Sequence, residues 1–509
     1  MKRIATIALV ALAFTSCEKF VDVNTNPNTP TVTKANYVFS NALNNAGRIV
    51  SGGLHITGGH WTGYYAHSTS FTGGGQEKTY VFTNNDFNFF DGIYDNMADF
   101  QYVIDKGQAD GVGHLVGPSM IMQAMVMQKL VDIYGDVPFT EALKGTAFTE
   151  PKYDDAATIY SSLMKLLTDG QAKVSAATFP ISDPSDVFFN ANKARWMQLA
   201  NTLKMRLIVR RSNVSGYTPG ADLGTITADG VITAPVFCNP GYLKTVGKLN
   251  PYYQNWGFNE NDAPTGDFRK MNRVIVEWLK GSNDVFRLQR ICSVKGLSDN
   301  LSVSPNLSDY VAAPLGGDGS SYLSANVSAM GSMQIVKGQA TRPLLVMSDA
   351  EASFLQAEAI QRGWLTGSAQ AKYEEGVRKS FALSANAQNA SIATATAAAA
   401  DAAATSYLRN LTNLCDWSVS TDKLKTIWLQ KWVALCNVDG GEAWAEYRRT
   451  NSPSNPTGNC PSSPRSVAVS STVKEPVRFF YPLRESNVNG KNVPAGIDVF
   501  NSRVFWDIN

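Results

Sequence analysis

Two stretches of the sequence place aromatic side chains beside amides, hydroxyls and glycines, a combination that suits a carbohydrate-binding surface. Sugars offer apolar C–H faces and a ring of hydroxyls, so they bind exposed aromatic platforms flanked by Asn, Asp, Gln or Arg. The first stretch covers positions 60–76 and the second covers 250–259. Their aromatic members, which we predict to bind ligand, are Trp61, Tyr64, Tyr65, Phe71, Tyr252, Tyr253 and Trp256.

A glycine-rich segment at 316–322 could supply an adjoining flexible wall, with Asp318 and Tyr322 as further candidate ligand-binding residues. It is not a phosphate-binding P-loop, because no Gly-Lys-Ser/Thr follows the glycines. For each of these loop aromatics the alternative is that it packs its loop onto a scaffold. Exposure of the side chain therefore separates the two interpretations.

Residues suited to metal binding or catalysis are few. The sequence has 4 histidines and no HExxH pair, so we predict no histidine-rich metal centre. No cofactor is predicted either. The segment 259–262 could hold a structural calcium ion, although it lacks EF-hand spacing. Carboxylates at Glu260, Asp262 and Asp267 keep one enzyme alternative open, an all-α glycoside hydrolase whose two carboxylates lie about 5 to 10 Å apart.

The composition argues against other classes of protein. The 509 residues include 45 Lys or Arg and 43 Asp or Glu, which leaves a formal net charge of +2. Proteins that bind nucleic acid through its phosphates usually carry a basic excess, so no nucleic-acid partner is expected. Apolar residues make up 44% of the chain, which is enough for a large core. A purely structural helical-repeat adaptor remains a third alternative beside a binding protein and an enzyme.

The amino terminus is similar to a bacterial lipoprotein export signal. Lys2 and Arg3 precede an apolar run at 4–14, which is shorter than the roughly 20 residues of a membrane-spanning helix. The run ends in Phe-Thr-Ser-Cys at 14–17, which resembles a lipobox. We predict a signal peptide at 1–16, lipidation of Cys17 and a flexible tether over 17–34. The alternative is a conventional secretory signal in which Cys17 is an ordinary residue.

Helical periodicity predicts the scaffold that would position the candidate site. Expected helices lie at 120–133, 153–174, 194–211, 348–363, 368–381 and 391–404. Ser348 and Glu351 form an S-x-x-E capping box, and Gly363 stands where a helix-terminating glycine belongs. The hairpin at 348–381, of roughly 33 residues, matches a tetratricopeptide unit. We predict a mostly α protein, a tetratricopeptide-like helical-repeat scaffold forming one domain over 35–509. Its loop-rich parts, including the ligand-binding face, are expected at 51–85, 216–347 and 449–476.

Several short motifs, taken in order, resemble the SusD/RagB family of outer-membrane nutrient-binding lipoproteins from Bacteroidetes. The resemblance spans nearly the whole chain. The matching segments are Asn-Thr-Asn-Pro-Asn at 24–28, Tyr-Gly-Asp-Val-Pro-Phe at 134–139 with Glu-Ala-Leu at 141–143, the helix at 196–210, residues 351–364, Gln-Lys-Trp at 430–432 with residues 442–450, and a closing segment of Arg478, Tyr481, Pro482, Glu485 and Asn487.

The resemblance implies a non-catalytic protein that is lipid-anchored to the outer membrane at the cell surface and seated as a lid on a SusC-like TonB-dependent transporter. It implies that the lid captures an oligosaccharide, or a peptide as in RagB-like relatives, and passes it to the barrel. Most of the matching residues are then expected to be structural. Arg448 and Arg449 should form ion pairs within the scaffold, and Asp136 should accept hydrogen bonds from backbone N–H groups.

Replacing Cys17 with alanine removes the predicted acylation site. The acyl chains of a lipidated cysteine bury many methylene groups in a bilayer, so they hold a protein on the membrane. We expect the wild-type protein in the outer-membrane fraction and the Cys17→Ala variant in the soluble fraction or as an uncleaved precursor. Fractionation and immunoblotting measure this, and a processed variant found wholly in the outer membrane would contradict the lipobox prediction.

Overall fold

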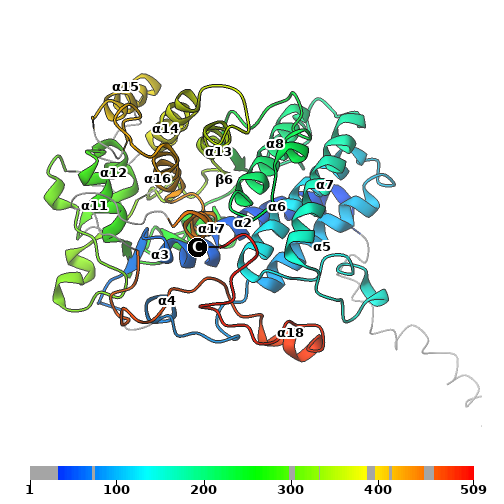
Figure 1. The fold of residues 1–509 in the computed structure, drawn as a ribbon, viewed down its shortest axis with the longest axis horizontal. Helices are drawn as coiled ribbons and strands as arrows, with labels where there is room; N and C mark the ends of the chain where they lie inside the picture. Colours follow the sequence, from blue (N-terminus) through cyan, green and yellow to red (C-terminus); the bar gives the residue numbers. More distant parts are fainter. Residues whose placement is uncertain are drawn as a thin grey trace, which may run out of the picture.

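The computed structural model describes residues 33–71, 75–296, 304–331, 333–386, 396–411, 415–451 and 464–508. The predicted signal peptide, Cys17 and nearly all of the predicted tether lie outside the described residues. Helices are the main regular structure, as the sequence predicts, and strands are few and short (Figure 1). Among the described residues, no helix has both the length and the apolar character needed to cross a membrane.

One half of the molecule, at the right of Figure 1, is a row of antiparallel helices. Its helices are α2 (Ala35–Ser51), α5 (Phe90–Lys106), α6 (Val116–Tyr134), α7 (Ala156–Ala176) and α8 (Lys193–Arg210). Helix α6 is buried on almost every face, and Met122, Met125 and Met127 fill the core around it. Helices α6, α7 and α8 pack as successive hairpins, which confirms the helical-repeat prediction.

The other scaffold helices follow later in the chain. They are α13 (Asp349–Gln361), α14 (Ala369–Ala385), α15 (Ala397–Leu408), α16 (Lys423–Leu435) and α17 (Gly440–Thr450). Helices α13 and α14 form the predicted hairpin, and Gly363 ends α13 with a φ of +75°. The predicted capping box forms only in part. Ser348 accepts the N–H of Ala350, but the carboxylate of Glu351 binds Arg206 instead of the cap backbone.

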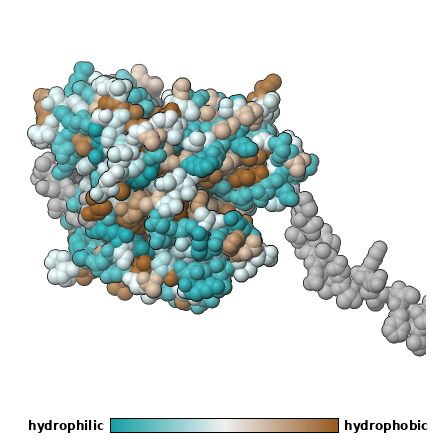
Figure 2. Space-filling view, turned by 45° about the vertical axis from the view of Figure 1, so that its right-hand side comes forward, coloured by the Kyte–Doolittle hydropathy of each residue, from teal (hydrophilic) through white to brown (hydrophobic). Residues whose placement is uncertain are grey.

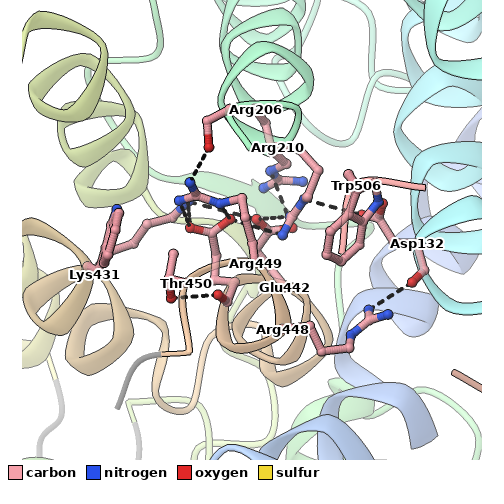
Figure 3. Close-up of polar contacts among 12 residues, drawn as sticks. Asp132, Arg206, Arg210, Lys431, Glu442, Arg448, Arg449, Thr450 and Trp506 are labelled. Carbon is pink, nitrogen blue, oxygen red and sulfur yellow. Dashed lines mark hydrogen bonds and ion pairs between the residues drawn. The ribbon is translucent and has the colours of Figure 1, made fainter. Parts of the chain in front are cut away.

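A buried charge cluster joins these two groups of helices (Figure 3). Arg206 on α8 donates to Glu351 on α13 at 2.7 and 2.9 Å, and Arg449 on α17 donates to Glu358 on α13 at 2.8 Å. The structural role predicted for Arg449 is therefore confirmed. The members of the cluster, all buried, are Asp132, Arg206, Arg210, Glu351, Glu358, Lys431, Glu442, Glu446 and Arg449.

The carboxyl-terminal segment closes against the same region. Trp506 donates its indole N–H to Asp132 at 2.9 Å. Arg448 donates to the backbone carbonyls of Asp132 and Val477, both at 2.8 Å, and its guanidinium lies 3.9 Å from the ring centroid of Trp444. Arg448 therefore has a structural role too. Asp136 accepts a backbone N–H as expected, although its donor is Ala156 at the start of α7.

The predicted loop-rich regions contain more regular structure than expected. Their short helices are α3 (Gly53–Trp61), α4 (Gln76–Thr79), α9 (Gly220–Leu223), α10 (Pro251–Trp256), α11 (Arg273–Gly281) and α12 (Val285–Ile291), with α18 (Leu483–Val488) nearer the carboxyl terminus. Short 3-10 helices are η1 (Gly113–Leu115), η2 (Gly145–Ala147), η3 (Leu307–Asp309), η4 (Ser320–Tyr322) and η5 (Ser324–Asn326). Helix α3 lies within 51–85, and α11 and α12 lie within 216–347, so both loop-rich regions also contain short helices.

Two small antiparallel sheets lie among these loops. The strands are β1 (Tyr65–His67), β2 (Val236–Cys238), β3 (Arg269–Met271), β4 (Cys292–Lys295), β5 (Ser328–Met330) and β6 (Leu344–Met347). One sheet has the order β1-β3-β5-β4, and β2 pairs with β6 in the other. On the face drawn in Figure 2, hydrophobic residues are interspersed with hydrophilic ones, because most large apolar side chains lie in the core.

Glu446→Gln tests how strongly the charge cluster stabilises the fold. Burial alone would raise the pKa of Glu446, but Arg449, Lys431 and Arg210 hold that pKa well below its usual value. The resulting stabilisation is present above the unfolded pKa of about 4.3 and is lost as the pH falls through the folded pKa. At pH 7 the variant leaves buried cations under-compensated, so we expect its free energy of unfolding to fall by about 3–5 kcal/mol in urea titrations.

The exposed pair between Lys165 and Asp169, at 2.5 Å, provides the control. Because solvent screens such a pair, Asp169→Asn should cost less than about 1 kcal/mol. Similar losses for the two variants would contradict the role assigned to the cluster.

Candidate ligand-binding site

The small sheet gathers three loops that are far apart in the sequence. Strands β1 and β3 pair antiparallel, with His67 opposite Arg269. Beyond the strands, Ser68 donates its N–H to the carbonyl of Phe268 at 2.7 Å, and Thr69 donates its N–H to the carbonyl of Tyr322 at 2.9 Å. Residues 67–71, 265–271 and 316–326 therefore meet at one surface, which we call the loop face.

Four side chains on the loop face form a stack that we call the aromatic–arginine ladder: Phe71, Phe268, Arg269 and Trp256. The ring centroids of Phe71 and Phe268 are 4.1 Å apart with an interplanar angle of 21°. The guanidinium carbon of Arg269 lies 4.3 Å from the ring centroid of Phe268 and 4.7 Å from that of Trp256. The ladder thus alternates flat apolar surface with a cation.

The ladder is partly open to solvent. Phe71 is 37% exposed, and Phe268, Arg269 and Trp256 are half-buried. Helix α10 fixes Trp256, because Asn250 caps the helix and the indole N–H donates to the carbonyl of Ser51 at 2.6 Å. These exposed edges, next to polar groups of the loops, suit an aromatic platform for the apolar face of a sugar ring.

Two histidines form the floor beneath the ladder. The rings of His60 and His67 stack with centroids 4.5 Å apart, and His67 stacks in turn on Phe268 at 5.9 Å. Burial lowers the pKa of His67 to about 4, helped by the positive charges of Arg269 and Lys78, and burial lowers the pKa of His60 well below its usual value. Both rings are therefore neutral near pH 7 and act as packing surfaces.

Five of the predicted ligand-binding aromatics are not at the surface. Trp61 is 2% exposed, and the other four are fully buried: Tyr64, Tyr65, Tyr252 and Tyr253. The prediction that these side chains face solvent is therefore wrong. Their aromatic character serves the core, which is the alternative that the sequence left open.

The error at Trp61 came from the glycines around it. Glycines at 58 and 59 suggest a loop, but here they lie in α3, which packs tightly against α17. A Cβ atom on Gly58 would lie 2.3 Å from the carbonyl oxygen of Gly440, and one on Gly440 would lie 2.1 Å from that of His55. Only glycine permits this approach of the two backbones, so these residues mark close helix packing.

The buried tyrosines satisfy their hydroxyls inside the core. The hydroxyl of Tyr65 donates to Asn437 at 2.8 Å and lies 2.9 Å from Nε2 of His55, and the hydroxyl of Tyr252 lies 3.2 Å from the same nitrogen. Nδ1 of His55 accepts the N–H of Gly440 at 3.0 Å. This network links α3, α10 and α17, and it leaves these tyrosines with structural roles.

Asp318 and Tyr322 lie where a wall of the site was expected. Thr69 donates its hydroxyl to the carbonyl of Gly319 at 2.9 Å, which holds the 316–322 segment beside the segment that carries Phe71. Asp318 is exposed and Tyr322 is half-buried. Phe268 and Arg269, which complete the ladder, were missed by sequence reasoning because nothing in their own segment distinguishes them. Their position in the ladder follows from the pairing of β3 with β1, which the sequence does not indicate.

The segment 259–262, a candidate calcium site in the sequence, is a tight turn. Asp262 accepts from Lys244 at 2.5 Å and from the hydroxyl of Tyr253 at 2.8 Å. Over the described ranges, no group of three or more His, Cys, Asp or Glu side chains has the arrangement of a metal site.

A second concave surface lies away from the loop face, between α5 and α18. This cleft of about 250 Å³ has apolar and charged lining residues, among them Tyr94, Asp95, Pro138, Arg484 and Glu485. The segments around Tyr134 and Tyr481 meet next to it, since the hydroxyl of Tyr481 donates to the carbonyls of Tyr134 and Asp136. These two sequence motifs therefore bind each other and have a structural role.

The sequence matches the profile of a family described as SusD-like, starch-binding and associating with the outer membrane, over residues 27–482. The chain belongs to this SusD-like family. No curated protein matches the sequence. The assignment confirms the family resemblance drawn from the motifs, and the long match includes both the scaffold helices and the loop face.

Solved structures share the SusD-like fold at low sequence identity. A SusD homologue from Bacteroides fragilis is 20% identical, with 94% of this chain and 99% of that chain covered and a TM-score of 0.72. A SusD/RagB family protein from Bacteroides thetaiotaomicron is 18% identical, with 94% and 99% covered and a TM-score of 0.73. A chitin-binding SusD homologue from Flavobacterium johnsoniae is 20% identical, with 92% and 99% covered and a TM-score of 0.69.

Proposed function

We propose that this SusD-like protein captures an oligosaccharide on its loop face and delivers it to a SusC-like TonB-dependent transporter in the outer membrane. We further propose that a lipid on Cys17 anchors it at the cell surface. The family is described as starch-binding and associating with the outer membrane, and one structural relative is named as chitin-binding. The observation that carries the proposal for this chain is the half-exposed aromatic–arginine ladder.

The ladder offers the chemistry that sugar binding requires. A pyranose ring stacked on Phe71 or Trp256 would bury its C–H face, while its hydroxyls remain near polar groups of the loops such as Asn255, which is exposed at the end of α10. Each such platform contributes on the order of 1 kcal/mol. A site built from one or two platforms binds modestly, which suits a protein that must release its ligand to a transporter.

The carboxylates that kept a glycoside hydrolase alternative open have structural partners. Asp262 accepts from Lys244 and Tyr253, and Asp267 pairs with Lys270 at 2.9 Å. Although burial opposes it, the hydrogen bonds from Lys244 and Tyr253 lower the pKa of Asp262, which makes it a poor general acid near pH 7. These engagements favour binding without catalysis.

Removing either exposed platform should weaken glycan binding. We expect Trp256→Ala and Phe71→Ala each to lower affinity about tenfold, which corresponds to about 1.4 kcal/mol. Isothermal titration with maltohexaose, chitohexaose and the glycan that supports growth measures the effect, with circular dichroism to confirm folding. A peptide digest in the same titration tests the RagB-like alternative.

Phe148→Ala is the matched control, because Phe148 is 40% exposed, close to the 37% of Phe71, and lies outside the loop face after η2. It should bind like the wild type. Wild-type affinity in both ladder variants, or binding of the peptides alone, would contradict the proposal.

A further inference from the structure

Arg269 lacks a close counter-ion among the residues that the structure describes. Its guanidinium lies between the rings of Phe268 and Trp256, and the residue is half-buried. Among the residues that the structure describes, no carboxylate lies within 4.0 Å of it, and its Nε has no hydrogen-bond partner. Burial lowers the pKa of Arg269 to about 10, and the negative charge of Glu77 opposes this only in part.

Other buried guanidiniums in the chain have close partners. Arg206 binds Glu351 at 2.7 Å, and Arg449 binds Glu358 at 2.8 Å. A guanidinium removed from water without a counter-ion costs stability. Together with the position of Arg269 between two half-buried rings of the loop face, this cost points to a functional role, because perturbed ionisable groups concentrate at binding sites.

The other charged groups around the loop face leave Arg269 available. Asp267 is tied to Lys270 at 2.9 Å, and Asp318 is exposed to water. Burial raises the pKa of Glu77, and this carboxylate forms no ion pair within 4.0 Å of Arg269. Lys78 adds a second positive charge near His67, whose ring is neutral near pH 7.

We infer that the natural ligand of the loop face is an acidic oligosaccharide, whose carboxylate or sulfate ester pairs with Arg269 while its rings stack on Phe71 and Trp256. The inference rests on the proposed glycan-binding function. The planar guanidinium presents paired N–H donors that match the two oxygens of such an oxyanion, and exclusion of water strengthens the pair. The rings on both sides of Arg269 fix the conformation of its side chain before a ligand binds, so little side-chain entropy is lost on binding.

Matched acidic and neutral probes test the inference. Isothermal titration compares hexagalacturonate with its methyl ester, which lacks the charge, and a κ-carrageenan hexasaccharide with its desulfated form. We expect the acidic member of at least one pair to bind tenfold or more tightly than its neutral partner, with an affinity that falls as salt rises. The pair that responds identifies the anion as a carboxylate or a sulfate.

Arg269→Gln should reduce the affinity for the acidic probe at least tenfold more than it reduces the affinity for the neutral partner. Arg269→Lys keeps the charge but loses the planar arrangement of N–H donors. Its affinity for the acidic probe should therefore lie between those of the wild type and Arg269→Gln. If Arg269 were only structural, Arg269→Gln would lower the melting temperature. We expect a melting temperature that is unchanged or higher, because the variant removes an unpaired desolvated charge.

The outcomes separate this inference from the proposed function. If acidic and neutral glycans bind equally, and Arg269→Gln does not weaken the acidic glycan more than the neutral one, the inference is overturned. Glycan capture then remains in place. Binding of peptides with no binding of any glycan overturns both.

Discussion

The buried charge cluster is the constraint on which the rest of the fold depends. It places the guanidiniums of Arg206, Arg210 and Arg449 against carboxylates from α6, α13 and α17, and all of these groups are buried. A buried ion pair is worth little compared with a well-packed apolar contact, but leaving one partner alone is costly. The helices α8, α13, α16 and α17 must therefore meet in the one register that pairs every charge.

The geometry of the loop face follows from that register. Helix α17, held by Glu442, Glu446 and Arg449, packs its first turn against α3 through contacts between glycine backbones. Helix α3 leads into β1, and β1 pairs with β3 to align the segments that carry Phe71 and Arg269. The ladder is thus an exposed feature supported by a rigid interior, which suits recognition by stacking because the platforms need little reorganisation on binding.

The scaffold could be predicted from the sequence because its signals are local. The apolar pattern of 120–133 and the glycine at 363 act within a few turns of helix, and α6 and α13 appear where they indicated. The loop face could not be predicted in the same way, because the same residue types serve both cores and binding surfaces. Trp61 and Trp256 occur in similar sequence contexts, yet one lies under α17 and the other at the surface.

The ladder itself depends on contacts between distant segments. Phe268 and Arg269 reach the loop face because their strand pairs with residues 67–71, about 200 positions away in the sequence. No local sequence pattern indicates this pairing. Glu351 shows the same limit at shorter range. Its spacing from Ser348 indicated a helix cap, but the stronger attraction of a buried guanidinium on another helix determines its position.

A crystal structure of the protein with a bound oligosaccharide tests the central claim most directly. We expect sugar density stacked on Phe71 or Trp256, with an oxygen of the ligand within hydrogen-bonding distance of Arg269. The scaffold helices should not shift. Density in the cleft between α5 and α18 instead, with the ladder unoccupied, would contradict it.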